Sequence, residues 1–387
     1  MELKEYVYTK TEELLEEFKE VNDYIYAHPE LGNEEFLSSQ YLVDKMSEYG
    51  FDVAYPYLDL PTAFRAELNC GEGPKIAFLA EYDALPGYGE SGDQKAHACG
   101  HNWIAASTYG ACVVLSQLKE HFNGTIVFIG TPAEETTGGK CDLVDRGAFD
   151  DIDAAFQMHL GAENNLNVVT LAIDSIEFNF EGVAAHAAAY PERGINALDA
   201  VQLTYAGINA LRQHMQPDAR VHGIITNGGQ AANTVPNKAQ CQFYIRAKKR
   251  AYLDELTQKV INCAKGAELM TGAKLTYRHF ENSYDDLINH QGLIALAKTT
   301  MEDLGITDFV ENDENASGSS DIGNVSHVCP TCYIELNTGA NPPAYAHNED
   351  FLNCVSGALA YRTLAIAVKT MAYTALQVYL DPTIIQK

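Results

Sequence analysis

Five short segments of this chain concentrate side chains that could bind a metal ion or move a proton. They contain a thiol, imidazoles and carboxylates, which are the ligands that divalent zinc prefers in proteins. The segments are residues 80–86 (AEYDALP), 97–102 (HACGHN), 131–135 (TPAEE), 157–159 (QMH) and 345–348 (YAHN). Their residue types predict a metal site with a proton-transferring group beside it.

The spacing within two segments fits a site for two ions. Cys99 and His101 lie two residues apart, so a loop or a strand could direct both toward one ion. Glu134 and Glu135 are adjacent, and adjacent side chains on extended chain point in opposite directions. We therefore expect one carboxylate to bind metal while the other faces the water that it deprotonates. Two ions about 3.5–4 Å apart can share a bridging ligand and hold a water between them.

Each of these residues also has an ordinary structural explanation. A histidine after an apolar strand is more often a hydrogen-bonded structural residue, a Glu-Glu pair usually lies in solvent, and Cys99 alone would be a small buried hydrophobe. Their combination at the ends of predicted strands favours the metal site. Cys329 and Cys332 have C-x-x-C spacing but no second pair, and we interpret them as incidental residues of a strand.

Strands and helices must alternate to position these segments. Apolar runs predict strands at 76–80, 125–130 and 154–159, and helical spacing predicts helices at 9–27, 103–122 and 358–380. We expect Thr9 and Glu12 to form the capping box of the first helix. The alternation indicates an α/β fold with a mostly parallel sheet, in which ligands bind at the carboxyl ends of the strands.

A second domain is predicted inside this fold. Its expected strands are 175–180, 221–226, 240–245 and 274–279, and its expected helices are 196–214 and 251–271. The order is β-α-β-β-α-β, which is typical of a ferredoxin-like sandwich. We therefore predict a catalytic dimetal domain of residues 1–173 and 282–387 and an inserted domain of residues 174–281.

The charge of the chain excludes some partners. Acidic residues outnumber basic ones 53 to 26, for a formal net charge of −27. Such a field repels nucleic acid and anionic membrane surfaces. The start of the chain has no basic stretch followed by an apolar run, and Arg362 and Lys369 interrupt the apolar stretch 358–380. With nine scattered cysteines, these features predict a cytoplasmic protein with reduced thiols.

Several of these motifs together resemble the M20 metallopeptidases. They are residues 28–32 (HPELG), 80–86, 97–102, 132–135 (PAEE) and 182–187 (GVAAHA). Within that family the chain is most similar to the amidohydrolase branch. The form LAEYDALP, with CGHN in place of CGHD, looks closest to the subgroup of aminobenzoyl-glutamate hydrolases and cytosolic dipeptidases.

The resemblance implies a role for each candidate residue of the catalytic domain. Cys99 lies at the position of the bridging ligand. His101 and His159 would complete one ion site, and Glu135 and His347 the other. Glu134 matches the general base. Asp83 matches the acidic residue that orients the metal ligands without binding the ions itself.

The resemblance also implies that the inserted domain is a lid that forms a dimer contact. His186 would reach the partner subunit's active site and polarise the scissile carbonyl, while Asn233 and Arg246 would hold the substrate's carbonyl and carboxylate. From the residues alone, His186 in an Ala-rich turn could be structural. Arg246, near Lys248, Lys249 and Arg250, could belong to an ordinary basic turn.

We therefore expect an enzyme that uses two divalent ions, zinc or manganese, to hydrolyse the amide bond of a small N-acyl amino acid or dipeptide. We expect a homodimer or a higher homo-oligomer. One alternative is an aryl-acyl hydrolase of the aminobenzoyl-glutamate type. Another is a non-catalytic metal-binding scaffold or chaperone-like protein. Asn102 replaces a frequent Asp and the segment 87–96 looks longer than usual, so we carry no finer specificity over from relatives.

Overall fold

The computed structural model describes residues 2–310 and 318–386 as two compact units. The first unit comprises Met1–Val169, Leu287–Asn315 and Asn324–Lys387, and the second comprises Thr170–Asp286 and Ala316–Gly323. Each unit has its own hydrophobic core.

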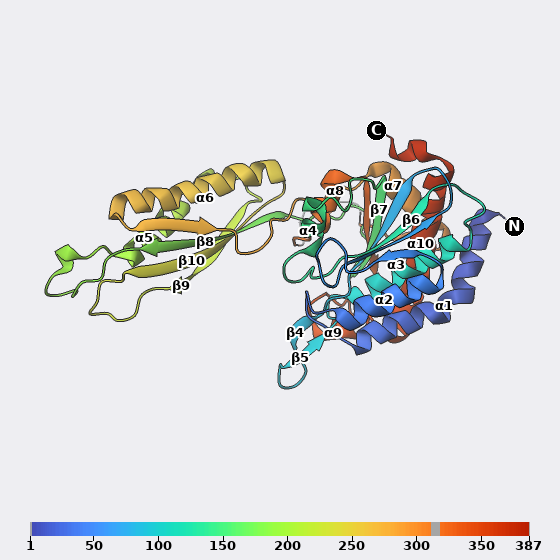
Figure 1. The fold of residues 1–387 in the computed structure, drawn as a ribbon, viewed down its shortest axis with the longest axis horizontal. Helices are drawn as coiled ribbons and strands as arrows, with labels where there is room; N and C mark the ends of the chain where they lie inside the picture. The colour runs from blue at the N-terminus through green and yellow to red at the C-terminus, as the bar shows by residue number, and fades with distance from the viewer. Residues whose placement is uncertain (1, 311–317, 387) are drawn as a thin grey trace. The chain divides into compact units, whose positions relative to one another are not determined.

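A mostly parallel sheet forms the centre of the first unit (Figure 1). Its strands are β1 (Asp52–Ala54), β2 (Phe64–Asn69), β3 (Lys75–Ala80), β6 (Thr125–Gly130), β7 (Ala154–Gly161) and β12 (Thr331–Asn337), in the order β1-β2-β6-β3-β7-β12. Strands β6, β3, β7 and β12 run parallel to one another. At one edge of the sheet, β2 pairs antiparallel with β6, and β1 pairs antiparallel with β2. The predicted α/β class is thereby confirmed.

Helices cover this sheet. They are α1 (Leu3–Ala27), α2 (Phe36–Glu48), α3 (His101–Ser116), α4 (Gly139–Asp145), α7 (Gln291–Asp303), α8 (Ile322–Val328), α9 (Glu349–Leu352) and α10 (Gly357–Leu380), with a short 3₁₀ helix, η3 (Pro382–Ile385), after α10. Every residue of α3 is buried, and the helix packs between the sheet and helices α1 and α10. This burial explains why its sequence is apolar all round rather than on one stripe.

Two predicted helix ends were wrong. Helix α1 begins at Leu3, because Val7 and Thr11 continue its buried face toward the N-terminus, so Thr9 lies inside the helix and caps nothing. Helix α3 ends at Ser116 rather than at residue 122. The backbone N–H groups of the turn residues that follow donate to carbonyl groups three or four residues earlier.

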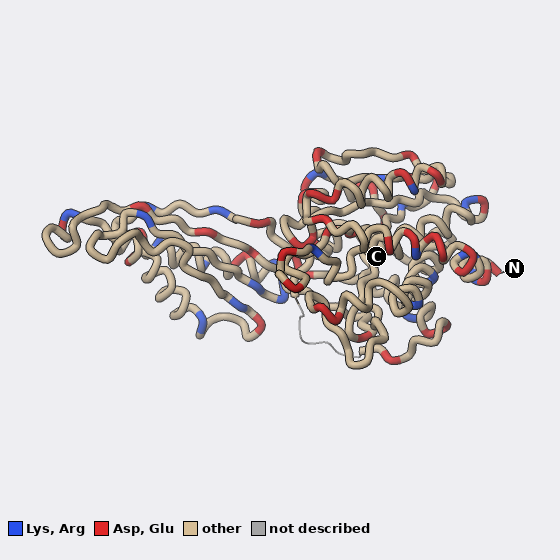
Figure 2. Tube along the Cα trace, turned by 90° about the horizontal axis from the view of Figure 1, so that it is seen from below, with Lys and Arg blue, Asp and Glu red and all other residues tan. Residues whose placement is uncertain are grey.

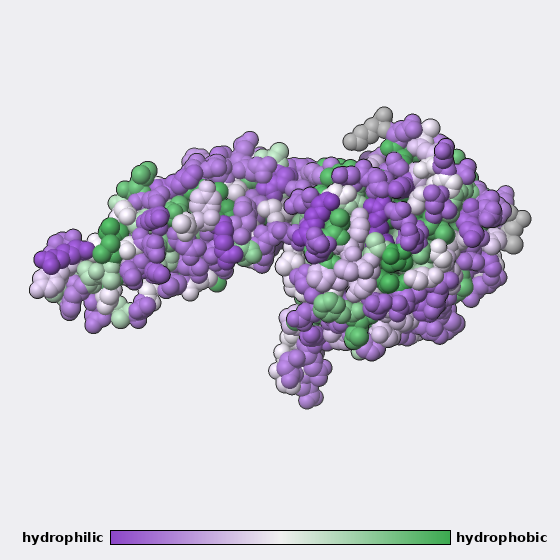
Figure 3. Space-filling model, in the orientation of Figure 1, coloured by the Kyte–Doolittle hydropathy of each residue, from purple (hydrophilic) through white to green (hydrophobic). Residues whose placement is uncertain are grey.

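Segment 87–96 contributes to a hairpin. Strand β4 (Leu85–Tyr88) pairs antiparallel with β5 (Gln94–Ala96), next to the segment that carries Cys99. Among the described residues, no helix is long and apolar enough to cross a membrane. The face seen in Figure 3 is largely hydrophilic, with hydrophobic residues in small separate patches.

The second unit is an antiparallel sheet with helices on one face. Its elements are β8 (Ala172–Glu181), η1 (Pro191–Arg193), α5 (Ala197–Leu211), η2 (Arg212–His214), β9 (Arg220–Asn227), β10 (Lys238–Ala247), α6 (Arg250–Thr271) and β11 (Lys274–Arg278). The sheet order is β11-β8-β10-β9, and the element order is the β-α-β-β-α-β arrangement of a ferredoxin-like sandwich. A role as lid stays a prediction.

Asn102 connects three distant segments of the first unit. Its side-chain amide donates to Asn22 Oδ1 on α1 at 3.0 Å and to the Val355 carbonyl before α10 at 2.7 Å, and the residue is fully buried. These contacts give the residue at this position a structural task that requires an amide.

We predict that Asn102→Asp destabilises the fold by about 2–5 kcal/mol. A carboxylate leaves the buried Asn22 Oδ1 without a donor, and it places a negative charge beside the Val355 carbonyl, which keeps only the 3.2 Å bond from Asn22 Nδ2. The free energy of unfolding in urea measures the effect. As a control, Asn262→Asp on α6 keeps the exposed oxygen that accepts from Gln258 and should change stability by less than about 0.5 kcal/mol. Equal stability of the two variants would contradict the assigned contacts.

Candidate metal centre

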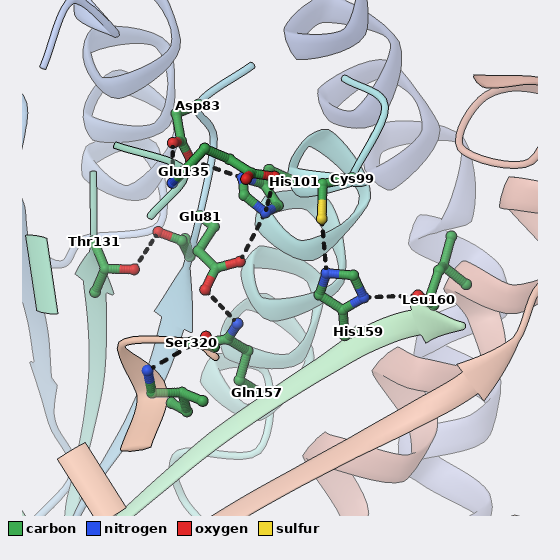
Figure 4. Close-up of polar contacts among 12 residues, drawn as sticks. Glu81, Asp83, Cys99, His101, Thr131, Glu135, Gln157, His159, Leu160 and Ser320 are labelled. Carbon is green, nitrogen blue, oxygen red and sulfur yellow. Dashed lines mark hydrogen bonds and ion pairs between the residues drawn. The ribbon is translucent and has the colours of Figure 1, made fainter. Parts of the chain in front are cut away.

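The candidate residues of the first unit come from the carboxyl ends of neighbouring strands. Glu81 and Asp83 follow β3, Glu134 and Glu135 follow β6, and His159 lies near the end of β7. Cys99 and His101 lie at the start of α3, and His347 lies in the segment before α9. Because parallel strands end at the same edge, these side chains converge, as Figure 4 shows for most of them.

Three groups of potential ligands that lie wholly within the first unit form at this edge. In each group the ligand atoms lie within 4.8 Å of one another. The groups are Cys99, His101 and His159; Cys99, Glu135 and His347; and His101, Glu134 and Glu135. The structure therefore brings together all five predicted ligands and the predicted base, and Cys99 is shared by the first two groups.

His159 is oriented for ligation. Its Nδ1 lies 2.6 Å from the Leu160 carbonyl oxygen, to which only an N–H can donate. This contact leaves the lone pair on Nε2, which lies 3.4 Å from Cys99 Sγ (Figure 4). A histidine whose one nitrogen is fixed by a carbonyl and whose other nitrogen faces a thiol has the arrangement of a metal ligand.

Asp83 positions two other candidate ligands. Its Oδ1 accepts a hydrogen bond from His101 Nδ1 at 2.7 Å, and its Oδ2 accepts from the Glu135 backbone N–H at 2.9 Å. The side chain is buried, so both bonds are shielded from water. Asp83 thus links the start of α3 to the turn after β6, which is the supporting arrangement predicted for it.

The pKa values in this cluster reflect crowded acidic groups. Burial, followed by the Glu135 carboxylate, raises the pKa of the Cys99 thiol well above its ordinary value. Burial lowers the pKa of His101, but the carboxylates of Asp83 and Glu81 outweigh it and raise that pKa well above normal. The close contact with the Glu135 carboxylate raises the pKa of His347, whose Nε2 lies 3.1 Å from Glu135 Oε1. A thiolate among these carboxylates requires a cation beside it.

The unused polar atoms of the cluster fit a metal ion. Among the described residues, none completes a well-oriented hydrogen bond to His101 Nε2 or Glu135 Oε1, although both atoms are buried. A buried polar atom without a partner costs about 1–3 kcal/mol. The donor set of thiol, imidazole and carboxylate is the set that zinc-like cations use, so the residues fit such an ion.

The sequence analysis missed a buried glutamate behind the turn 131–135. Glu35 Oε1 accepts from the Ala133 backbone N–H at 2.8 Å, and Glu35 Oε2 accepts from Thr62 Oγ1 at 2.8 Å. Ala133 adopts a φ of 61°, a conformation that non-glycine residues rarely hold without support. Burial, followed by the charge of Asp83, raises the pKa of Glu35 to about 7.

A second missed feature is a buried ion pair beside His101. Lys140 Nζ lies 2.5 Å from Glu81 Oε1, which also accepts from Gln157 Nε2 at 2.7 Å. Glu81 Oε2 lies 3.3 Å from His101 Nε2. Burial opposes ionisation of Glu81, but Lys140 and then His101 lower its pKa to about 2. Lys140 gave no sequence signal, because a lysine after a Gly-rich turn ordinarily lies in solvent.

In the second unit, His186 and Asn233 lie close together. The Ala187 N–H donates to the Asn233 carbonyl at 3.0 Å, and His186 forms a β-bridge with Thr234. Both segments lie beyond the Lys238 end of β10, where Lys238 pairs with Glu181 of β8. His186 is exposed, and its Nδ1 accepts from the backbone N–H groups of the two alanines that follow Ala187.

Arg246 lies at the opposite end of the same strand. It pairs with Ile173 at the start of β8. Strand β10 has 10 residues, so it spans about 30 Å at ~3.3 Å per residue. A dipeptide reaches about 7 Å when extended. Within one chain, therefore, the structure does not bring Arg246 together with His186 and Asn233 around a single small substrate.

The guanidinium of Arg246 lacks the carboxylate partner that its basic neighbour has. Arg250 binds Asp174 with two hydrogen bonds, of 2.9 and 2.8 Å. The Arg246 guanidinium instead donates to Ser319 Oγ at 3.0 Å, and none of the residues described in the structure forms an ion pair with it. Burial lowers the pKa of Arg246. A half-buried, unpaired guanidinium is suited to bind an anion.

The fold and the site define an α/β protein with a cluster of potential metal ligands at one edge of its parallel sheet. Residues 77–377 match Peptidase family M20/M25/M40. The chain is 37% identical over 344 residues to the Xaa-Arg dipeptidase of Mus musculus, a match that covers 86% of this chain and 78% of the relative. It is 30% identical over 439 residues to one of the subunits of the p-aminobenzoyl-glutamate hydrolase of Escherichia coli, covering 96% of this chain and 90% of the relative.

The fold also matches solved structures. A dinuclear metal binding peptidase of the M20 family from Bacillus subtilis superposes with a TM-score of 0.74 at 20% sequence identity, covering 96% of this chain and 99% of that one. The chain belongs to peptidase family M20/M25/M40. The predictions of family, of α/β fold and of a metal-dependent enzyme that hydrolyses amide bonds are confirmed.

We predict that Asp83→Asn lowers metal affinity about 10–100-fold. An amide has one acceptor oxygen, so it cannot accept from both His101 and the Glu135 backbone, and one ligand loses its orientation. Calorimetric titration of the apo protein with zinc measures the affinity. Asp93→Asn, in the exposed turn between β4 and β5, is the matched control and should bind metal as the wild type does. Unchanged affinity in Asp83→Asn would refute the positioning role.

Proposed function

We propose that this enzyme uses two divalent ions, zinc or manganese, to hydrolyse a small dipeptide or N-acyl amino acid. Cys99 would bridge the ions, His101 and His159 would hold one, and Glu135 and His347 would hold the other. The observation that carries this proposal is the sharing of Cys99 by two ligand groups whose atoms lie within 4.8 Å. A thiolate that belongs to both groups would contribute to both ion sites.

The residues of the chain divide the reaction between them. When bound, the ions would polarise the amide carbonyl and lower the pKa of a water molecule toward neutrality. Glu134 would remove the proton from that water and deliver it to the nitrogen of the leaving amine as the C–N bond breaks. Asp83 would keep His101 and the turn at Glu135 in place throughout.

His186 is proposed to act on the neighbouring subunit of a homodimer or higher homo-oligomer. It would donate a hydrogen bond to the carbonyl oxygen as negative charge develops there. The separation of about 30 Å between the ends of β10 supports this proposal, because Arg246 and the pair of His186 and Asn233 then serve one substrate from different chains. Arg246 would hold the carboxylate and Asn233 the carbonyl.

The relatives and Arg246 support the proposed substrate class. A Xaa-Arg dipeptidase and a p-aminobenzoyl-glutamate hydrolase are both similar to this chain, and the substrates in both names are amides with a free carboxylate. We favour the dipeptide, and an aryl-acyl amide of the aminobenzoyl-glutamate type is the alternative. A non-catalytic scaffold is disfavoured, because it would have no need for Glu134 beside a full ligand set.

We propose the partners and the compartment of the enzyme from its net charge and from the free thiols of its cysteines. Figure 2 shows Asp and Glu positions spread over both units, in keeping with a net charge of −27. This field favours small cationic or zwitterionic partners over nucleic acid or anionic membranes. The described cysteines are all free thiols, which supports a reducing, cytoplasmic location.

We predict that substitutions of the two adjacent glutamates impair the enzyme in different ways. Glu134→Gln should keep its metal and lose roughly 10²–10⁴-fold in kcat, as expected for a general base. Glu135→Gln should lose metal, because the amide is a weaker ligand for the second ion. Elemental analysis and kcat, measured with alanyl dipeptides in added zinc or manganese, separate the two effects. Equal metal loss in both variants would show that the roles are assigned wrongly.

We also predict that two inactive homodimers recover activity when mixed. In a heterodimer of His186→Ala and Glu134→Gln, one site carries both defects and the other carries neither. Activity per heterodimer should approach half that of the wild type, with heterodimer formation verified by native mass spectrometry. If His186 served its own chain, every site would keep one defect and no activity would return.

A further inference from the structure

The ring of Tyr244 lies between a cation and an anion on the open face of the second unit's sheet. Tyr244 and Arg246 are two residues apart on β10 and therefore point to the same face. The guanidinium lies 5.8 Å from the centre of the tyrosine ring. The Tyr244 hydroxyl lies 2.8 and 2.9 Å from the two carboxylate oxygens of Glu281. We call these three residues the charged strip.

Glu281 is held in place by its backbone. Its N–H donates to Ser175 Oγ at 2.8 Å, and that hydroxyl lies 3.1 Å from the Glu281 carbonyl oxygen. Ser175 is buried on β8, so this end of the strip is anchored to the sheet. The Glu281 side chain is exposed and has one neutral donor, Tyr244. Across the described residues, no Lys, Arg or His forms an ion pair with it.

The groups packed against Tyr244 add no further charge that pairs directly with Arg246 or Glu281, although the Glu281 carboxylate acts on the Arg246 guanidinium through space. The His222 ring lies 5.7 Å from the Tyr244 ring, and burial, followed by the charges of Arg246 and Arg212, lowers the pKa of His222. His222 is therefore neutral near pH 7 and does not balance Glu281. Phe280 packs edge-on against Tyr244 with ring centres 5.3 Å apart. The strip thus presents an available cation, an aromatic surface and an available anion in sequence.

We propose that the charged strip selects substrates whose C-terminal residue has a basic side chain, with Glu281 as the specificity-determining residue. This inference rests on the proposed function, in which Arg246 holds the substrate's carboxylate. The side-chain ammonium or guanidinium of the same residue pairs with Glu281, and its methylene groups pack along the Tyr244 ring. An acidic C-terminal residue places a second carboxylate against Glu281, and that repulsion rejects it.

The test compares substrates that differ in the charge of the C-terminal residue. The panel is alanyl-arginine, alanyl-lysine, alanyl-alanine and p-aminobenzoyl-glutamate, assayed with the metal-loaded enzyme. In Glu281→Gln the ratio of kcat/KM for alanyl-arginine to that for alanyl-alanine should fall about tenfold, as expected for loss of one partly solvated charged contact. Glu281→Lys should shift the preference toward p-aminobenzoyl-glutamate.

The matched controls are Glu255→Gln and Glu255→Lys. Glu255 is an exposed residue of α6, so these variants change the net charge equally without touching the strip. They should leave the ratio unchanged. A similar fall in the control ratio, or equal effects of Glu281→Gln on the arginine and alanine substrates, would overturn the role of Glu281 and leave the proposed hydrolysis intact.

Calorimetric binding of free L-arginine to the same metal-loaded protein separates the two proposals. Binding that is about tenfold weaker in Glu281→Gln and normal in Glu255→Gln supports recognition by the strip without any turnover. If the wild type binds arginine in this way but cleaves no member of the panel, the proposed dipeptide hydrolysis fails and the recognition stands. If it neither cleaves the panel nor binds arginine, both fail.

Discussion

The crowding of ionisable groups at one edge of the parallel sheet is the constraint on which the first unit depends. Glu81, Asp83 and Glu135 lie there with little or no access to water, and burying a carboxylate is costly unless it is paired. Lys140 compensates Glu81, and His101 compensates Asp83. The remaining charge of Glu135, with the thiol of Cys99 beside it, is the part of the cluster that a cation best offsets. Metal affinity and stability of this edge are therefore linked.

The edge also explains why supporting residues matter as much as the ligands. The turn after β6 is fixed from two sides, since Glu35 accepts from the Ala133 N–H and Asp83 accepts from the Glu135 N–H. Between these two anchors, Glu134 and Glu135 project from backbone that has little freedom. A base and a ligand on adjacent residues can then serve different atoms without exchanging places.

The sequence predicted the parts of this arrangement that depend on local pattern. The strand at 125–130 matches β6 because an apolar run is bounded by a polar turn and a glycine, and the ligands were identified because their residue types are rare beside such runs. Lys140 and Glu35 escaped prediction because their partners, Glu81 and Ala133, lie 59 and 98 residues away. Such pairs resemble surface charges until the fold brings them together.

Strand β10 shows how one alternating pattern can serve both stability and recognition. Ala239, Cys241, Phe243, Ile245 and Ala247 are buried in the core of the second unit. Because side chains alternate between the two faces of a strand, the residues between them lie on the face without helices, and Tyr244 and Arg246 are among these. The core residues fix the register with β8, and that register places Tyr244 opposite Ser175, whose hydroxyl accepts from the Glu281 N–H. A shift by one residue would bury the guanidinium and expose the phenylalanine, so the same hydrophobic packing that stabilises the unit keeps the charged strip on its open face.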